Sequence, residues 1–194
     1  VFTPSISFVA TSNAIYHSGA RPYFIDCDQD DFGISPSSLD AEIKLNTIQK
    51  KGCLFNKKNG RKISAILATH VFGHSCKINE LKKISKKYNL LLIEDAAECM
   101  GSFLDNKHLG TFGDLGILSF NGNKTITTGG GGAILVNNSS LAEKIRHIST
   151  TAKLKHPWEY NHDQVGFNYR MPNLNASLGC AQLLRLDELL HKKR

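Results

Sequence analysis

A lysine followed by a run of glycines is the feature of this sequence that most suggests covalent chemistry. Lys124 ends the segment Ser119–Lys124, and Gly129–Gly132 follow shortly after it. Four consecutive glycines allow close backbone approach to another group, at an entropic cost that an ordinary loop does not need to accept. A lysine that is desolvated or near a cationic group loses proton affinity and becomes an imine-forming amine. A solvated loop lysine is the other interpretation of Lys124.

Carboxylates stand at the end of an earlier apolar segment. Glu94, Asp95 and Glu98 follow Leu91–Ile93, and the two alanines between them leave room for a ligand. In enzymes that use pyridoxal phosphate (PLP), a carboxylate beside the pyridine nitrogen keeps that nitrogen protonated, so that the ring can accept electrons. Asp95 is the candidate for this role. The same carboxylate is equally suited to cap a helix, and that interpretation also applies to Glu94 and Glu98.

Short apolar segments recur along the chain with helix-like segments between them. A helix is predicted over 39–45, because Ser35 can cap its free amides and Pro36 suits its first turn. Strands that alternate with helices imply crossover connections and a mainly parallel α/β sheet, with ligands beyond the carboxyl ends of the strands. The predicted strands are Tyr23–Asp26, Ile63–Ala68, Leu90–Glu94, Ile117–Phe120 and Ala133–Val136.

The helix predicted between the second and third of these strands is amphipathic. Ile78, Leu81, Ile84 and Tyr88 mark one face of it, and lysines mark the other face. We therefore expect this helix to cover the sheet.

Other segments interrupt or follow the alternation. Asn46–Lys62, which is rich in Lys and Arg, is predicted to be a long surface loop or insertion. Ser139–His147 is predicted to be a helix and Thr150–Asn168 an irregular stretch. Pro172–Leu190 is predicted to be one long final helix.

The basic balance of the chain is compatible with several kinds of anionic partner. Lys and Arg number 24 against 17 Asp and Glu, a formal net charge of +7. Such a charge can attract nucleic acid, anionic membrane or phosphorylated small molecules. The lysines occur mostly in pairs along predicted helices and a loop, which favours solvated faces, so neither a nucleic-acid nor a membrane partner is expected. A nucleic-acid binder stays open as a hypothesis that steeply salt-dependent binding would support.

The cysteines give no sign of a disulfide framework or a zinc site. The five are widely separated, odd in number and form no CxxC pair, as expected in a reducing cytoplasm. No apolar run approaches the length of about 18 residues that a membrane helix needs.

Taken in order, the motifs resemble those of the DegT/DnrJ/EryC1/StrS family of PLP-dependent sugar aminotransferases, which have the fold-type I architecture. Glu94–Glu98 matches the family's EDAAQ or EDAAE pattern, and Ser119–Gly129 matches its SFxxxK…TTG pattern. Further resemblances lie in Thr3–Thr11, Gly166–Met171 and Ala176–Leu183, so the likeness spans nearly the whole chain.

The resemblance implies cofactor-binding roles for five of these residues. Lys124 would hold PLP as an imine and act as general base, and Asp95 would pair with the pyridine nitrogen. Glu98 stands where the family has Gln or Glu near the ring hydroxyl. Ser119 would bind the cofactor phosphate, and Phe8 would stack on the ring.

The resemblance also implies how the chain is organised and assembled. Residues 1–170 would form the central part of the PLP-binding large domain, and residues 171–194 would begin a connecting helix toward a C-terminal small domain. The chain opens without a start methionine and is expected to be a piece of a longer protein, inactive by itself. Asn168 belongs to a segment that would reach the neighbouring subunit's active site and touch its cofactor phosphate. A cytoplasmic homodimer is therefore implied.

One stretch points to a substrate. Ala152–Asp163 resembles the branch of the family that aminates C4 of a UDP-linked 4-keto-6-deoxy-N-acetylhexosamine for legionaminic-acid or bacillosamine-type glycans, with glutamate as the amino donor. His156, Trp158 and Arg170 are then candidates for contact with this nucleotide-sugar substrate. Packing within an irregular lobe accounts for His156 and Trp158 equally well.

Two histidines near a predicted strand end could line the ligand pocket. His70 and His74 flank a short segment after a predicted strand, but no carboxylate or thiolate partners stand at fitting positions. We expect structural histidines and no metal site.

Two alternative functions of a protein with this fold are also considered as hypotheses. A sugar dehydratase of the same fold has histidine at the lysine position, and Lys124 argues against it. A catalytically silent relative with a binding or regulatory role is the alternative function, and the presence of Lys124, Asp95 and Ser119 argues against that hypothesis.

Overall fold

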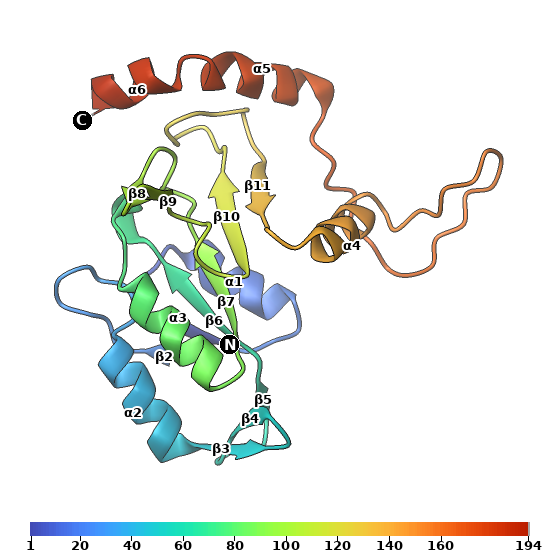
Figure 1. The fold of residues 1–194 in the computed structure, drawn as a ribbon. Helices are drawn as coiled ribbons and strands as arrows, with labels where there is room; N and C mark the ends of the chain where they lie inside the picture. Colours follow the sequence, from blue (N-terminus) through green and yellow to red (C-terminus); the bar gives the residue numbers. More distant parts are fainter. Residues whose placement is uncertain (194) are drawn as a thin grey trace.

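The computed structural model describes residues 1–193, which are built around a six-stranded sheet (Figure 1). The strand order is β11-β10-β7-β6-β1-β2, and all neighbours are parallel except β10 and β11. Within the described residues this is the mainly parallel α/β sheet that the sequence predicts. Its strands are β1 (Phe2–Pro4), β2 (Tyr23–Ile25), β6 (Ala65–Thr69), β7 (Leu91–Asp95), β10 (Leu115–Ser119) and β11 (Gly132–Leu135).

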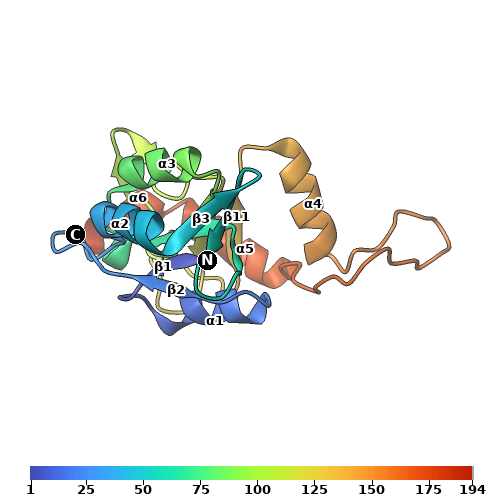
Figure 2. The same ribbon diagram turned by 90° about the horizontal axis from the view of Figure 1, so that it is seen from below.

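Helices lie on both sides of the sheet, with α2 and α3 on one side and α1 on the other (Figure 2). The helices are α1 (Val9–His17), α2 (Pro36–Asn46), α3 (Ile78–Lys87), α4 (Ser139–Ser149), α5 (Asn173–Leu183) and α6 (Leu186–Lys193), with one 3₁₀ turn, η1 (Val71–Gly73). α2 begins as predicted, because Ser35 Oγ accepts a hydrogen bond from Ser38 N at 3.2 Å. None of the helices in the described part of the chain is long and apolar enough to span a membrane.

The core lies between the sheet and α2 and α3. Phe2, Ile66 and Leu92 of the sheet have almost no exposed surface, and they meet the apolar faces of the two helices. Burial of each such side chain contributes about 1.5–3 kcal/mol. The predicted amphipathic helix is α3, which buries Ile78 and Leu81 completely against the sheet.

The five predicted strands are all present, each with bounds within two residues of those expected, and the predicted helix Ser139–His147 is α4. The sequence interpretation missed β1 and α1. β1 has only three residues, too few for a periodic pattern, and α1 buries only Thr11 and Ile15, so its apolar face is weak.

The prediction of a surface loop over Asn46–Lys62 is wrong. The segment forms a small antiparallel sheet of β3 (Thr47–Lys50), β4 (Cys53–Asn56) and β5 (Lys62–Ile63). Lys51 and Gly52 both have positive φ, 49° and 74°, as the two-residue turn of a hairpin requires. The basic composition of the segment gives no strand pattern, because only a few apolar side chains make the buried contacts of this sheet.

The prediction of one long helix over Pro172–Leu190 is also wrong. The segment is divided into α5 and α6, because Arg185 N donates to Gln182 O, three residues back, at 3.0 Å and tightens the turn. α6 carries Leu190, whose side chain contacts Gly101. Gly101 shortly precedes a hairpin of β8 (Phe103–Leu104) and β9 (Lys107–His108).

The irregular stretch Thr150–Asn168 is confirmed, and we call it the arm. It contains only isolated bridges, between Thr150 and Asn168 and between Lys153 and His162. Figure 1 shows the arm extending away from the sheet beyond α4.

Candidate active site

The carboxyl ends of two neighbouring parallel strands define the candidate site. β7 ends at Asp95, β10 ends at Ser119, and Ile117 is the register partner of Asp95. The segments that leave these strands carry Glu98 and Lys124. Residues far apart in the sequence therefore start from adjacent points on one edge of the sheet.

Asp95 is tied by hydrogen bonds to α1 and to its own turn. Its Oδ2 accepts a hydrogen bond from Thr11 Oγ1 at 2.6 Å, and its Oδ1 accepts one from Ala97 N at 3.2 Å. Thr11 Oγ1 accepts a hydrogen bond from Ser7 Oγ at 2.7 Å. The residues after Asp95 form turns and then β8, not a helix. The interpretation of Asp95 as a helix cap is therefore wrong.

One residue earlier in β7, the Glu94 side chain has no exposed surface. Its Oε2 accepts hydrogen bonds from His70 Nε2 at 3.0 Å and from Gly110 N at 2.8 Å, and its Oε1 accepts one from Gly113 N at 2.6 Å. The other ring nitrogen of His70, Nδ1, accepts a hydrogen bond from Cys76 N at 3.3 Å. We therefore assign the neutral His70 tautomer with its proton on Nε2. The expectation that His70 is structural agrees with this burial and pairing.

The charge of Glu94 is retained by this network. Burial by itself raises the pKa of Glu94, but the hydrogen bonds from His70, Gly113 and Gly110 outweigh burial and hold the pKa below its ordinary value. The backbone N of His70 also donates to Asp95 O at 3.1 Å. The network thus fixes the strand end that presents Asp95.

Lys124 lies at a small cavity. Its Nζ is 3.2 Å from Glu98 Oε1, and its side chain is 19% exposed. The backbone O of Lys124 accepts a hydrogen bond from Lys193 Nζ at 3.2 Å. The cavity has a volume of about 180 Å³ and is lined by Phe72, Glu98, Asn123, Lys124, Thr125 and Lys193. Lys124 is therefore not the solvated loop lysine of the alternative interpretation.

The glycine run after Lys124 forms a loop held by α5. Asn175 Nδ2 donates to Thr128 O at 2.5 Å, and Gln182 Oε1 accepts a hydrogen bond from Thr127 N at 2.9 Å. Gly129 and Gly131 have φ of 76° and 103°, backbone angles that residues other than glycine rarely adopt. α5 thus fixes the loop that leads from Lys124 back into β11.

Two other predicted cofactor residues lie near this edge of the sheet. Ser119 is half-buried at the end of β10, where its Oγ accepts a hydrogen bond from Asn121 N at 3.3 Å. Phe8 precedes α1 with its side chain 78% exposed, and its neighbour Ser7 connects to Asp95 through Thr11.

The remaining predicted residues lie in or next to the arm and do not join Asp95 and Lys124 within one copy of the chain. Trp158 is 85% exposed, and His156 Nδ1 accepts hydrogen bonds from Trp158 N and Glu159 N. Asn168 and Arg170 are exposed. The arm projects away from the sheet in Figure 1.

Comparison with known proteins identifies the chain. The model of the DegT/DnrJ/EryC1/StrS aminotransferase family matches residues 1–194. The chain belongs to this family. It is 37% identical to GDP-perosamine synthase of Escherichia coli O157:H7 and 39% identical to EpsN of Bacillus subtilis (strain 168), named as a pyridoxal phosphate-dependent aminotransferase. All of this chain is covered in both alignments, against 49% and 47% of these relatives.

A solved family structure has the same fold. Helicobacter pylori PseC, an aminotransferase involved in the biosynthesis of pseudoaminic acid, superposes with a TM-score of 0.82 at 30% identity. The superposition covers 96% of this chain and 46% of PseC. The chain therefore has the fold-type I architecture of the family and spans about half the length of the relatives it matches.

The residues at the strand ends fit PLP, the cofactor of the DegT/DnrJ/EryC1/StrS family. The cofactor's aldehyde requires an amine, and its pyridine nitrogen requires a carboxylate. Lys124 supplies the amine at a cavity, and Asp95 supplies a carboxylate at the end of the adjacent strand. An added Cβ at Gly130 would meet nothing within 4 Å, so the loop also leaves open space.

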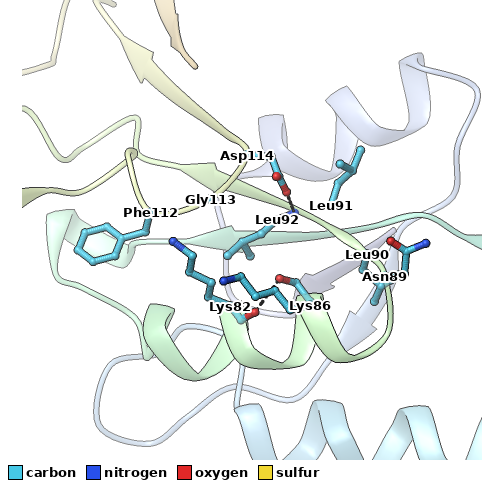
Figure 3. A pocket seen from close by; sticks show the side chains of 10 residues that line it. Lys82, Lys86, Asn89, Leu90, Leu91, Leu92, Phe112, Gly113 and Asp114 are labelled. Atoms are coloured by element: carbon cyan, nitrogen blue, oxygen red, sulfur yellow. Dashed lines mark hydrogen bonds between the residues drawn. The ribbon is translucent and has the colours of Figure 1, made fainter. Parts of the chain in front are cut away.

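A larger cavity of about 450 Å³ lies at the opposite ends of these strands (Figure 3). It is bounded by Lys82 and Lys86 of α3, by the start of β7 and by the turn that leads into β10. Because ligands of open α/β sheets bind beyond the carboxyl ends of the strands, the smaller cavity at Lys124 is the candidate site of this family member.

Sequence reasoning missed two contributors to the family site. Thr11 lies in the segment Thr3–Thr11 that carries part of the family resemblance, but its link to Asp95 spans 84 residues and leaves no local signal. Phe72 lines the cavity beside Lys124, and its position between His70 and His74 predicts no role for its ring.

We predict that Glu94→Gln lowers the free energy of unfolding by about 3 kcal/mol at pH 7, because an amide places a donor against at least one of three buried donors. A depressed native pKa contributes stability above the unfolded-state pKa and loses it as pH falls through the native pKa. The wild-type chain should therefore lose stability below about pH 4.5, the ordinary value, and the variant should lack this component. Denaturant unfolding across pH measures both effects.

Glu143→Gln, on the exposed face of α4, is the matched control and should change stability by less than about 0.5 kcal/mol. If Glu94→Gln behaves like this control, the buried network does not have the role described.

Proposed function

We propose that the full protein containing this chain is a PLP-dependent aminotransferase that moves an amino group from glutamate to a nucleotide-linked keto sugar. The observation that carries the proposal is that an amine and a carboxylate follow from the carboxyl ends of two adjacent strands. Lys124 lies at a cavity with its Nζ 3.2 Å from Glu98 Oε1, and Asp95 ends the neighbouring strand. The names of two relatives, GDP-perosamine synthase and the PseC aminotransferase, support a sugar substrate.

The proposed roles follow from the chemistry of each side chain. Bound PLP would supply an electron sink for the carbon that loses its proton. Asp95 would keep the pyridine nitrogen protonated, and its bonds from Thr11 and Ala97 orient it for this role. Lys124 Nζ would hold the cofactor covalently and, once released, would move a proton from the amino-acid Cα to the cofactor carbon that bears the amino group. In the sugar half-reaction it would move a proton in the reverse direction, from that carbon to the sugar carbon. Glu98 would lie near the ring hydroxyl of the cofactor.

Two further residues complete the proposed cofactor site, and the site lies within the proposed large domain. Ser119 would bind the phosphate together with amides of the loop after Lys124, a loop rich in glycine. Phe8, with its exposed ring, would cover one face of the cofactor. Residues 1–170 would be the central part of the PLP-binding large domain, with residues 171–194 leading toward a small domain.

The proposed substrate is a UDP-linked 4-keto-6-deoxy-N-acetylhexosamine, aminated at C4 for bacillosamine or legionaminic-acid glycans. This choice rests on the likeness of Ala152–Asp163 to that branch of the family. His156, Trp158 and Arg170 are the proposed substrate contacts, and all three are exposed in a single copy. Turnover with UDP-linked and GDP-linked keto sugars under the same conditions distinguishes the nucleotides.

A homodimer would complete the site. The arm holds Trp158, Tyr160 and Val165 with 85%, 76% and 90% of their surfaces exposed, as expected for residues that pack against a second copy. Asn168, at the base of the arm, would then reach the neighbouring subunit's cofactor phosphate. The arm is therefore proposed as an exchanged segment between subunits.

The proposed compartment is the cytoplasm. The cysteines in the described part of the chain are free. Burial raises the pKa of the Cys99 thiol to about 12, which keeps it protonated and unreactive. Free cysteines, among them the buried and protonated Cys99, are consistent with a reducing environment.

We predict that Lys124→Ala in the full protein lowers turnover to below roughly one thousandth of wild type, because it removes both the covalent attachment and the base. Asp95→Asn should lower turnover by roughly 10²-fold or more and leave the fold intact, since its amide group can still meet Thr11 and Ala97. Formation of 2-oxoglutarate from glutamate measures turnover. Lys144→Ala, an exposed lysine of α4, is the matched control. Undiminished transamination by Lys124→Ala would refute the mechanism.

We also predict complementation between two inactive variants, Lys124→Ala and Asn168→Ala. If Asn168 acts on the neighbouring subunit's site, a mixed dimer contains one site with both native residues and one site with neither. An equimolar, re-equilibrated mixture should recover roughly one quarter of wild-type activity, because about half of its dimers are mixed. Activity assays of each variant alone and of the mixture make the measurement. No recovery in dimers that native mass spectrometry shows to be mixed would contradict the trans role of Asn168.

A further inference from the structure

The cavity beside Lys124 is bordered by an aromatic ring that lies outside the core. Phe72 lines the cavity together with Glu98 and Lys124, and its surface is 80% exposed. An exposed phenylalanine contributes little to folding, since its apolar surface stays in water. Its placement at the mouth of the cavity therefore calls for a ligand.

The backbone at this residue is strained. Phe72 has φ 53° and ψ 25°, in the left-handed region, which a bulky residue rarely occupies. Glycine would adopt the same conformation without a steric penalty. Strain of this kind persists only where the surrounding structure imposes it, and it gathers at ligand-binding sites.

The surroundings do impose it. His70 is anchored through its ring to buried Glu94, Gly73 N donates to His70 O at 3.2 Å, and His74 N donates to Val71 O at 3.0 Å. These bonds close a tight turn with Phe72 at its tip.

Gly73 also fixes the turn against the site. It has φ 78°, and an added Cβ would lie 2.7 Å from the backbone O of Glu98. The turn therefore contacts the backbone of the residue whose carboxylate pairs with Lys124. The backbone of Phe72 is therefore held next to the residue that pairs with the amine.

We propose that Phe72 is a substrate-binding residue whose ring packs against the apolar face of the sugar in the nucleotide keto sugar. One face of a hexopyranose ring presents C–H groups, and a 6-deoxy sugar adds a methyl group, which together suit an aromatic surface. Glutamate has no comparable face. Phe72 thus discriminates in favour of the sugar half of the reaction, an inference that rests on the proposed aminotransferase function.

The two half-reactions separate this role from the proposed function itself. In the full protein, Phe72→Ala should raise KM for the nucleotide keto sugar roughly tenfold, a typical loss for one aromatic contact. The rate of the glutamate half-reaction should change less than about twofold, since glutamate does not use the ring. Phe72→Tyr should restore the sugar KM. If the proposed function fails, the wild-type protein will produce no 2-oxoglutarate from glutamate, a result that does not depend on Phe72.

A stability measurement distinguishes substrate binding from a structural role. Phe72→Gly should relieve the left-handed strain and leave Tm unchanged or higher by a few degrees, while the sugar KM rises as it does for Phe72→Ala. Phe32→Gly is the matched control, because Phe32 is also left-handed, with φ 59°, is 48% exposed and does not line the cavity. It should change Tm in the same direction and leave the sugar KM unaltered.

The expected pattern is a sugar KM that rises only in the Phe72 variants, with Tm maintained. The proposal is overturned if Phe72→Ala leaves the sugar KM unchanged, if it slows the glutamate half-reaction to the same extent, or if Phe72→Gly lowers Tm.

Discussion

Glu94 is a carboxylate with no exposed surface, and it accepts hydrogen bonds from His70, Gly110 and Gly113. An ion removed from water destabilises the fold by several kcal/mol unless its hydrogen-bonding capacity is satisfied. These partners come from two separate segments: the turn after β6, which supplies His70, and the connection to β10, which supplies the backbone amides of Gly110 and Gly113. Each segment must keep its place relative to the end of β7. Asp95 is the next residue of that strand, so its position depends on the same constraint.

The candidate site follows from this fixed edge of the sheet. β7 and β10 are adjacent and parallel, so their carboxyl ends deliver a carboxylate and the segment that carries an amine. The glycine loop after Lys124 is secured from its other side by α5, and the turn at Phe72 is secured by His70. Anchored segments thus carry Phe72 and Lys124, which line the cavity, as a preorganised site requires. The arm remains outside this arrangement and is exposed in a single copy.

The sequence predicts the local parts of this arrangement well and the long-range parts poorly. Buried apolar runs predict strands that end at Glu94 and Phe120, each within one residue of the ends at Asp95 and Ser119, and the glycine run marks the loop at Lys124. The pairing of His70 with Glu94 and of Thr11 with Asp95 joins positions 24 and 84 residues apart, and no local pattern encodes it. The small sheet in 46–62 was hidden by its basic composition, and the division between α5 and α6 has no glycine or proline to mark it.

Trapping of the bound cofactor tests the central claim that Lys124 is the residue that carries it. The full protein would be purified with PLP, its absorbance recorded before and after borohydride reduction, and the reduced adduct mapped by peptide mass spectrometry. The account predicts visible absorbance that reduction abolishes and a pyridoxyl group on Lys124. A protein that binds no PLP, or one labelled at a different lysine, would contradict the account.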